Sequence, residues 1–169
     1  MKFAKLVMVP MLALVCGPVM AQKDGPPVFL PIKQLSMDMA LRLAQTAIQF
    51  CRKEGVNVAV TVVDRGGHPQ VVLRDTLAMD LTLTISRDKA YTAMSFNMPT
   101  SELEGRFPGA YSVPKVNGLI ISAGGLPITI AGSIVGGVGV SGAPSGVTDE
   151  KCATAGLNAI LDDLEMSGM

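Results

Sequence analysis

The single histidine of the chain is the first residue to consider for chemistry. His68 follows Gly66-Gly67 at what the pattern predicts to be the tip of a β-hairpin. An imidazole there either ligates iron or another metal or makes a hydrogen bond within the turn, and the sequence leaves both open. Asp64 ends the preceding strand, and we expect its carboxylate to accept the turn amides. A catalytic Asp64–His68 pair would need a nucleophile nearby, and the sequence points to none.

Lys89 is the second candidate, because it stands among apolar residues of a predicted helix. A lysine on a largely buried face needs an anionic partner, which is either a ligand carboxylate or a buried acidic side chain. Tyr91 and Tyr111 carry phenol oxygens that can bind a ligand. Tyr111 is the better candidate of the two, together with Phe107, since both stand in a long loop rich in glycine and proline over 105–118.

Glycine-rich segments offer a third kind of site. Gly124-Gly125 either presents backbone amides to an anion or only forms a turn between strands. The run Gly136-Gly-Val-Gly139 lies inside an apolar, strand-like segment and not between a strand and a helix, so it is not a dinucleotide-binding loop. We expect these glycines to let a helix or a subunit pack closely against a sheet.

The composition excludes several classes of site and partner. The chain has 169 residues, with 14 Lys and Arg against 14 Asp and Glu, so it has no cationic excess for nucleic acid as its main partner. One histidine cannot form a zinc site that needs two imidazoles. The sequence also contains no CxxC pair, phosphate-binding loop or GxSxG elbow. No catalytic constellation emerges, and whether the protein is an enzyme stays open.

Residues 1–21 have the pattern of a secretory signal peptide. Lys2 and Lys5 precede an apolar stretch, and the segment ends in a small residue that suits cleavage. We therefore expect a periplasmic or secreted protein that meets a membrane only through this peptide, before cleavage. Cys51 and Cys152 remain after cleavage, and in an oxidising compartment they either pair or stay as buried thiols.

The hydrophobic pattern predicts one α+β domain over 35–169, after a proline-rich extended arm over 22–34. Strands joined by tight turns must be antiparallel, and five such strands form the predicted sheet. The predicted helices run from a Ser36 cap to Gly55, over Leu81–Asn97, and from a Thr148 cap to Glu165; the predicted strands are 57–64, 69–74, 119–123, 127–131 and 133–141.

Four segments in order resemble the GlcG/HbpS-like haem-binding family, which also occurs as the C-terminal domain of PduO-type proteins. They are Val60-Thr-Val-Val-Asp-Arg-Gly-Gly-His68, Lys89-Ala-Tyr-Thr-Ala93 with Pro99-Thr100, Gly124-Gly-Leu-Pro127, and Gly136-Gly-Val-Gly-Val-Ser-Gly142 followed by Asp149-Glu150. The resemblance covers roughly 35–165. It implies a profilin-like, five-stranded antiparallel sheet of order 2-1-5-4-3, with helices on both faces and assembly into a dimer or larger homo-oligomer.

The resemblance also implies a ligand, since some relatives bind haem or related tetrapyrroles. We expect a pocket beside the second helix and the long loop, with haem as the leading ligand. The expected ligand-binding residues are Lys89, Phe107, Tyr111, Gly124 and Gly125, with His68 as the candidate iron ligand. Two alternatives remain: an accessory enzyme of glycolate-like acid catabolism, in which Lys89, Tyr111 and Asp64 position a carboxylate, and a structural assembly subunit.

Overall fold

The computed structural model describes residues 25–107 and 113–168, and the chain divides into two units, 1–31 and 32–169. Within the first unit, residues 25–31 form no helix or strand and are exposed. Proline fixes φ and lacks an amide hydrogen, so the three prolines of this segment disfavour both kinds of element. The predicted signal peptide, 1–21, lies outside the described residues.

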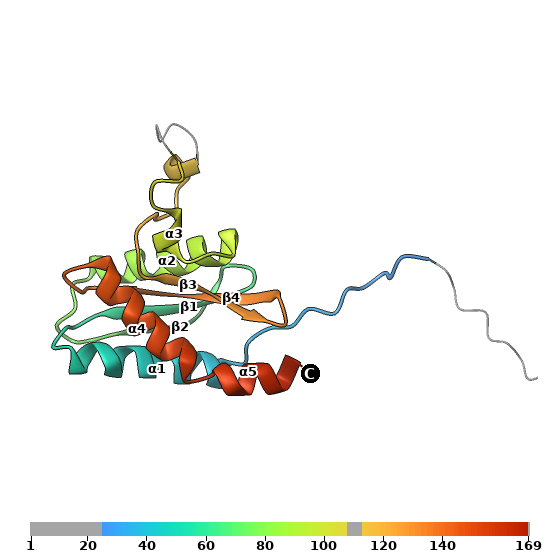
Figure 1. Ribbon diagram of the computed structural model, residues 1–169, viewed down its shortest axis with the longest axis horizontal. Coiled ribbons are helices and arrows are strands. Elements are labelled where there is room, and N and C mark those ends of the chain that lie inside the picture. Colours follow the sequence, from blue (N-terminus) through green and yellow to red (C-terminus); the bar gives the residue numbers. More distant parts are fainter. Residues whose placement is uncertain (1–24, 108–112, 169) are drawn as a thin grey trace, which may run out of the picture. The chain divides into compact units, whose positions relative to one another are not determined.

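The described residues of the second unit form a four-stranded antiparallel sheet with helices on both faces (Figure 1). In chain order the helices are α1 (Met37–Lys53), α2 (Leu81–Phe96), α3 (Thr100–Leu103), α4 (Gly146–Asn158) and α5 (Leu161–Gly168), and the strands are β1 (Ala59–Asp64), β2 (Pro69–Arg74), β3 (Gly125–Ile130) and β4 (Ser133–Ser141). The strand order is β2-β1-β4-β3. Helices α1, α4 and α5 lie on one side of the sheet, and α2 and α3 lie on the other (Figure 1). None of the described helices is both long and apolar enough to cross a membrane.

Helix α1 begins where the sequence predicts. The Ser36 hydroxyl accepts a hydrogen bond from the Met39 amide at 3.3 Å, which satisfies one of the free amides of the first turn. Asp38 in the first turn and Arg52 with Lys53 in the last turn complement the helix dipole. The cap and these charges stabilise the two ends of the helix.

The predicted strand over 119–123 is wrong, and the sheet therefore has four described strands in place of five in the order 2-1-5-4-3. Two amides of this segment bind side chains, and that of Leu119 closes a turn with the Val116 carbonyl at 3.3 Å. The Ile120 amide donates to Thr92 Oγ1 at 2.9 Å, and the Ala123 amide donates to Glu104 Oε1 at 2.8 Å. Because these amides already have hydrogen-bond partners, they do not pair with a neighbouring strand.

The prediction of one continuous last helix with a Thr148 cap is also wrong. The helix begins at Gly146, because the Ser145 hydroxyl caps it by accepting from the Thr148 amide at 3.3 Å. It then divides into α4 and α5. At the junction, Arg42 of α1 donates to the carbonyl of Ala159, so this carbonyl has a partner outside α4 and α5. Arg42 also pairs with Asp163 of α5 at 2.7 Å.

The main hydrophobic core lies between the sheet and the pair α1 and α4. Its fully buried side chains include Leu43, Ile128 and Val138, and burying a side chain of this size contributes roughly 1.5–3 kcal/mol. The structure pairs Cys51 with Cys152, with their Cα atoms 5.5 Å apart, and so resolves the two alternatives for these cysteines. The disulfide joins α1 to α4 through the core.

The opposite face of the sheet has no comparable layer of large side chains, because α2 packs on glycine. A Cβ atom at Gly137 or Gly139 of β4 would overlap backbone atoms of Ala90 and Ser86. The predicted close packing at this glycine run is confirmed, with a helix as the partner. The contact is reinforced by a buried hydrogen bond between Thr61 and Ser86, whose hydroxyl oxygens are 2.8 Å apart.

Removal of the disulfide is expected to destabilise the domain strongly. The two cysteines are 101 residues apart, and closing a loop of that size in the unfolded chain contributes about 4–5 kcal/mol by the chain-entropy model. The Cys51→Ser/Cys152→Ser variant should lower the free energy of urea unfolding by about this amount. The wild type should lose the same amount under reductant, whereas the variant should not respond. Two free thiols in the folded, oxidised wild type would contradict the pairing.

Candidate functional site

A cleft of about 280 Å³ lies beside α2, where the β1–β2 turn approaches the helix. Its lining consists of Gly67, Pro69, Arg87, Asp88, Tyr91 and Gly118. The β1–β2 turn contributes Gly67, and β2 contributes its first residue, Pro69. The next three residues belong to α2, and the last belongs to the loop before β3. The cleft thus lies on the side of the sheet that carries α2, away from the large hydrophobic core.

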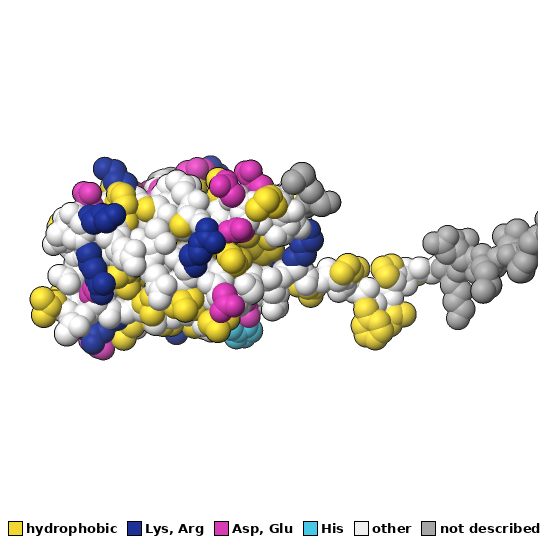
Figure 2. All heavy atoms as spheres, turned by 90° about the horizontal axis from the view of Figure 1, so that it is seen from below, with side chains coloured by type: hydrophobic (Ala, Val, Ile, Leu, Met, Phe, Trp, Pro, Cys, Tyr) yellow, Lys and Arg dark blue, Asp and Glu magenta, His cyan; other side chains and the backbone are white. Residues whose placement is uncertain are grey.

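Asp64 determines the shape of the turn that carries His68. Its Oδ1 atom accepts the amides of Gly66 at 2.8 Å and His68 at 2.9 Å, as the sequence predicts. The same oxygen lies 3.5 Å from His68 Nδ1. The imidazole itself is 82% exposed, and it is visible on the surface in Figure 2 (cyan). With Nδ1 beside the carboxylate, Nε2 is the nitrogen left for an external ligand.

Tyr91 connects the turn to the helix. Gly67 has a φ of +82°, a conformation that favours glycine, and a Cβ atom there would overlap the Tyr91 ring. The ring therefore packs directly on the turn backbone while the side chain stays partly exposed. An aromatic surface beside an exposed imidazole suits a flat, largely apolar ligand.

Arg87 supplies the positive charge of the cleft. Its Nε and Nη2 atoms bind Asp88 Oδ1 at 2.8 and 2.6 Å, which orients the guanidinium. Half of the Arg87 side chain remains exposed, and its other N–H groups can bind an anionic group. The sequence alone does not identify Arg87 as a candidate ligand-binding residue. An arginine on a helix becomes such a candidate only once the cleft beside it is known.

Lys89 lies elsewhere, in a buried ion pair. Its Nζ atom is 2.9 Å from Asp149 Oδ2 and donates to the Val140 carbonyl at 3.2 Å, and both charged side chains are 5% exposed. Burial raises the pKa of Asp149, because the loss of solvent outweighs the attraction of the ammonium. Of the two partners that the sequence left open for Lys89, the structure shows an acidic side chain.

The other predicted ligand contacts are not gathered around the cleft. The Gly124 amide donates to Glu150 Oε2 at 3.0 Å, and the Gly125 amide donates to Thr100 Oγ1 at 2.8 Å. Phe107 packs edge-on against Phe96, with ring centroids 5.9 Å apart. Tyr111 lies outside the described residues. Lys89, Asp64 and His68 do not line the cleft, although His68 lies between two lining residues in the sequence. Within the described chain, no three acidic, His or Cys side chains are grouped to hold a metal ion.

Comparison with known proteins gives matches over most of the chain. Residues 35–158 match the family model described as "Haem degrading protein HbpS-like". The chain is similar to the crystal structure of HbpS, with a TM-score of 0.76 and 38% identity over 79% of this chain and 94% of that one. It is similar to the crystal structure of a PduOC:haem complex, with a TM-score of 0.70 and 28% identity over 76% and 96% of the two chains. Protein GlcG of Escherichia coli K12 is 30% identical over 108 residues, 63% of this chain and 81% of GlcG.

Neutralising Asp149 is expected to destabilise the fold and to change its pH dependence. Asp149→Asn leaves the Lys89 ammonium buried without its counter-charge, which costs about 3–5 kcal/mol. In the wild type the raised pKa means that the folded state holds the Asp149 proton more tightly than the unfolded chain. The free energy of unfolding therefore falls as the pH rises from about 4 through the raised pKa.

Urea unfolding between pH 4 and 7 measures both effects. Asp149→Asn should be less stable and should lack this pH-dependent fall. The exposed Asp162→Asn serves as the matched control and should keep the wild-type profile. An unchanged pH profile in Asp149→Asn would show that Asp149 does not titrate differently in the folded state.

Proposed function

Because the chain belongs to the HbpS-like family, we propose that it binds haem or a related tetrapyrrole in the cleft between the β1–β2 turn and α2. The observation that carries the proposal is the similarity of about three quarters of the chain to a protein crystallised with haem. The cleft adds an aromatic ring and a guanidinium, and the exposed imidazole of His68 stands between Gly67 and Pro69, which both line the cleft.

Each of these groups has a distinct part in the proposed site. His68 would hold the haem iron through Nε2, with Asp64 holding the other ring nitrogen in position. Tyr91 would offer its ring to the macrocycle, and Arg87 would pair with a propionate. Bound haem would supply an iron centre for ligand binding or redox chemistry; the side chains of the cleft would hold it and tune it.

The size of the cleft supports a shared site. Ligand pockets usually enclose about 300–1,000 Å³, and this cleft of about 280 Å³ holds only one edge of a macrocycle. The opposite edge is left to solvent or to a second copy of the chain. We therefore include assembly into a homo-oligomer in the proposal, with the cleft close to the contact between copies.

Haem titration tests the proposed site. The purified protein should give a saturable Soret shift at micromolar haem, and His68→Ala should remove the spectral features of imidazole ligation, because it removes the axial nitrogen. Arg87→Gln should weaken binding about twofold to tenfold through loss of a partly exposed charge pair. Gln34→Ala is the matched control, since Gln34 is exposed and lies outside the cleft. No Soret shift, or an unchanged spectrum in His68→Ala, would contradict the proposal.

We also propose that the protein is exported to the periplasm or secreted. Residues 1–21 carry the pattern of a cleavable signal, and the Cys51–Cys152 disulfide is of the kind that persists in an oxidising compartment. Mass spectrometry of the protein recovered from periplasm or medium should show a chain that begins at Gln22 and contains no free thiol. Lys2→Glu/Lys5→Glu should retain the uncleaved chain inside the cell. An intact chain with reduced cysteines, found only in the cytoplasm, would overturn the proposal.

A further inference from the structure

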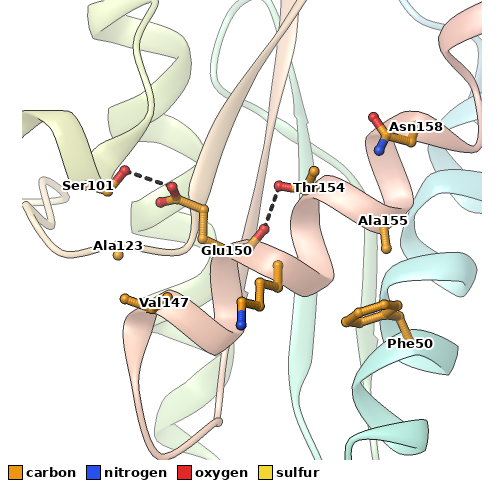
Figure 3. A pocket seen from close by; sticks show the side chains of 9 residues that line it. Phe50, Ser101, Ala123, Val147, Glu150, Thr154, Ala155 and Asn158 are labelled. Carbon is orange, nitrogen blue, oxygen red and sulfur yellow. Dashed lines mark hydrogen bonds between the residues drawn. The ribbon is translucent and has the colours of Figure 1, made fainter.

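A larger groove, of about 380 Å³, runs along α4 from Val147 to Asn158. Its walls come from α1, α3, α4 and the segment before β3 (Figure 3). The lining residues are Phe50, Ser101, Ala123, Val147, Glu150, Lys151, Thr154, Ala155 and Asn158. None of them lines the cleft beside Tyr91.

The groove has an apolar wall held in a fixed position. Phe50 of α1 faces Ala155 of α4, and Val147 lies near Ala123 at the other end (Figure 3). Cys51 directly follows Phe50, and Cys152 directly follows Lys151, so the disulfide joins the two helices beside the groove. A groove whose walls are covalently joined loses little conformational entropy when a ligand enters, which favours binding.

The two charged side chains of the groove, Glu150 and Lys151, differ in their hydrogen-bond and ion-pair partners. Glu150 Oε1 accepts the Ser101 hydroxyl at 2.7 Å, and Oε2 accepts the Gly124 amide at 3.0 Å. Within the described chain, Lys151 has no carboxylate at ion-pair distance, and its side chain is exposed. The N-terminus of α4, a 13-residue helix, adds a partial positive charge at the Val147 end. Both oxygens of Glu150 thus have hydrogen-bond donors, and Lys151 is the charged lining side chain with no ion-pair partner among the described residues.

We propose that this groove binds an amphipathic organic anion, which is a carboxylate attached to an apolar chain. Phe50, Val147 and Ala155 contact the apolar part, and the Lys151 ammonium pairs with the carboxylate. The Glu150 oxygens bind Ser101 and Gly124, so in the proposed site the anion pairs with Lys151, on the next residue of α4. This site is independent of the proposed haem site, because the two share no residue.

Three eight-carbon probes of different charge test the assignment. Sodium octanoate, n-octanol and octylammonium chloride are titrated below their micelle concentrations into the purified, oxidised protein, with binding followed by calorimetry and by NMR shifts of α4 amides. Octanoate should bind saturably and more tightly than the other two, because only it pairs with Lys151. Equal or tighter binding of octanol would show a merely apolar groove, and tighter binding of octylammonium would assign the charge to Glu150; either result overturns the proposal.

Variants separate the charge from the apolar wall. Lys151→Met keeps the aliphatic stem and should weaken octanoate about twofold to fivefold, as expected for a solvent-exposed ion pair. Lys53→Met, an exposed lysine outside the groove, is the matched control and should bind octanoate as the wild type does. Equal loss in both lysine variants would overturn the role of Lys151.

Ala155→Leu should fill the groove and abolish octanoate binding. Val147→Ser provides a second test of the apolar wall that does not depend on how the core tolerates a larger side chain, since Val147 is 62% exposed. It should weaken octanoate severalfold while circular dichroism shows an intact fold. Unchanged affinity in a folded Val147→Ser protein would overturn the proposal. Haem titration of Lys151→Met should match the wild type, so the two sites can fail separately.

Discussion

Helix α2 lies on the backbone of the sheet and not on a layer of side chains, and much of the structure depends on that contact. Gly125, Gly137 and Gly139 leave no Cβ atom where the helix backbone passes. Because the helix is so close, the hydroxyl of Ser86 reaches Thr61 on β1, and the ammonium of Lys89 reaches Asp149 at the start of α4. The glycines therefore allow a helix on one face of the sheet to be joined electrostatically to a helix that packs on the other.

The same close contact places the residues of the candidate site. Once α2 is seated on β4, Tyr91 lies against the backbone of Gly67, and the turn that carries His68 is held from two sides. Asp64 holds the turn from within, through two backbone amides. On the opposite face of the sheet, large apolar side chains and the Cys51–Cys152 disulfide hold α1 to α4. The polar, glycine-packed face carries the cleft, and the disulfide-linked helices form the separate groove.

The parts of this structure that sequence reasoning predicts are those determined by near neighbours in the chain. The Ser36 cap and the Asp64 turn each depend on side chains within a few residues. The close packing at Gly137 and Gly139 is predicted from the glycines themselves, while the sequence leaves its distant partner, the backbone at Ser86 and Ala90, open between a helix and a subunit. The errors come from distant residues. The segment 119–123 is not a strand, because Thr92 and Glu104 bind its amides from 28 and 19 residues away. The partner of Lys89 is 60 residues away, which is why two alternatives remained open.

In the proposed function the tetrapyrrole binds in the cleft beside Tyr91, and not in the larger groove on α4. Gallium protoporphyrin is a diamagnetic analogue of haem, so its binding site can be mapped on the protein by amide NMR shifts. The largest shifts should fall on residues 66–69, 87–91 and 116–118. Shifts confined to residues 147–158, with the amides of the His68 turn unchanged, would contradict binding in the cleft.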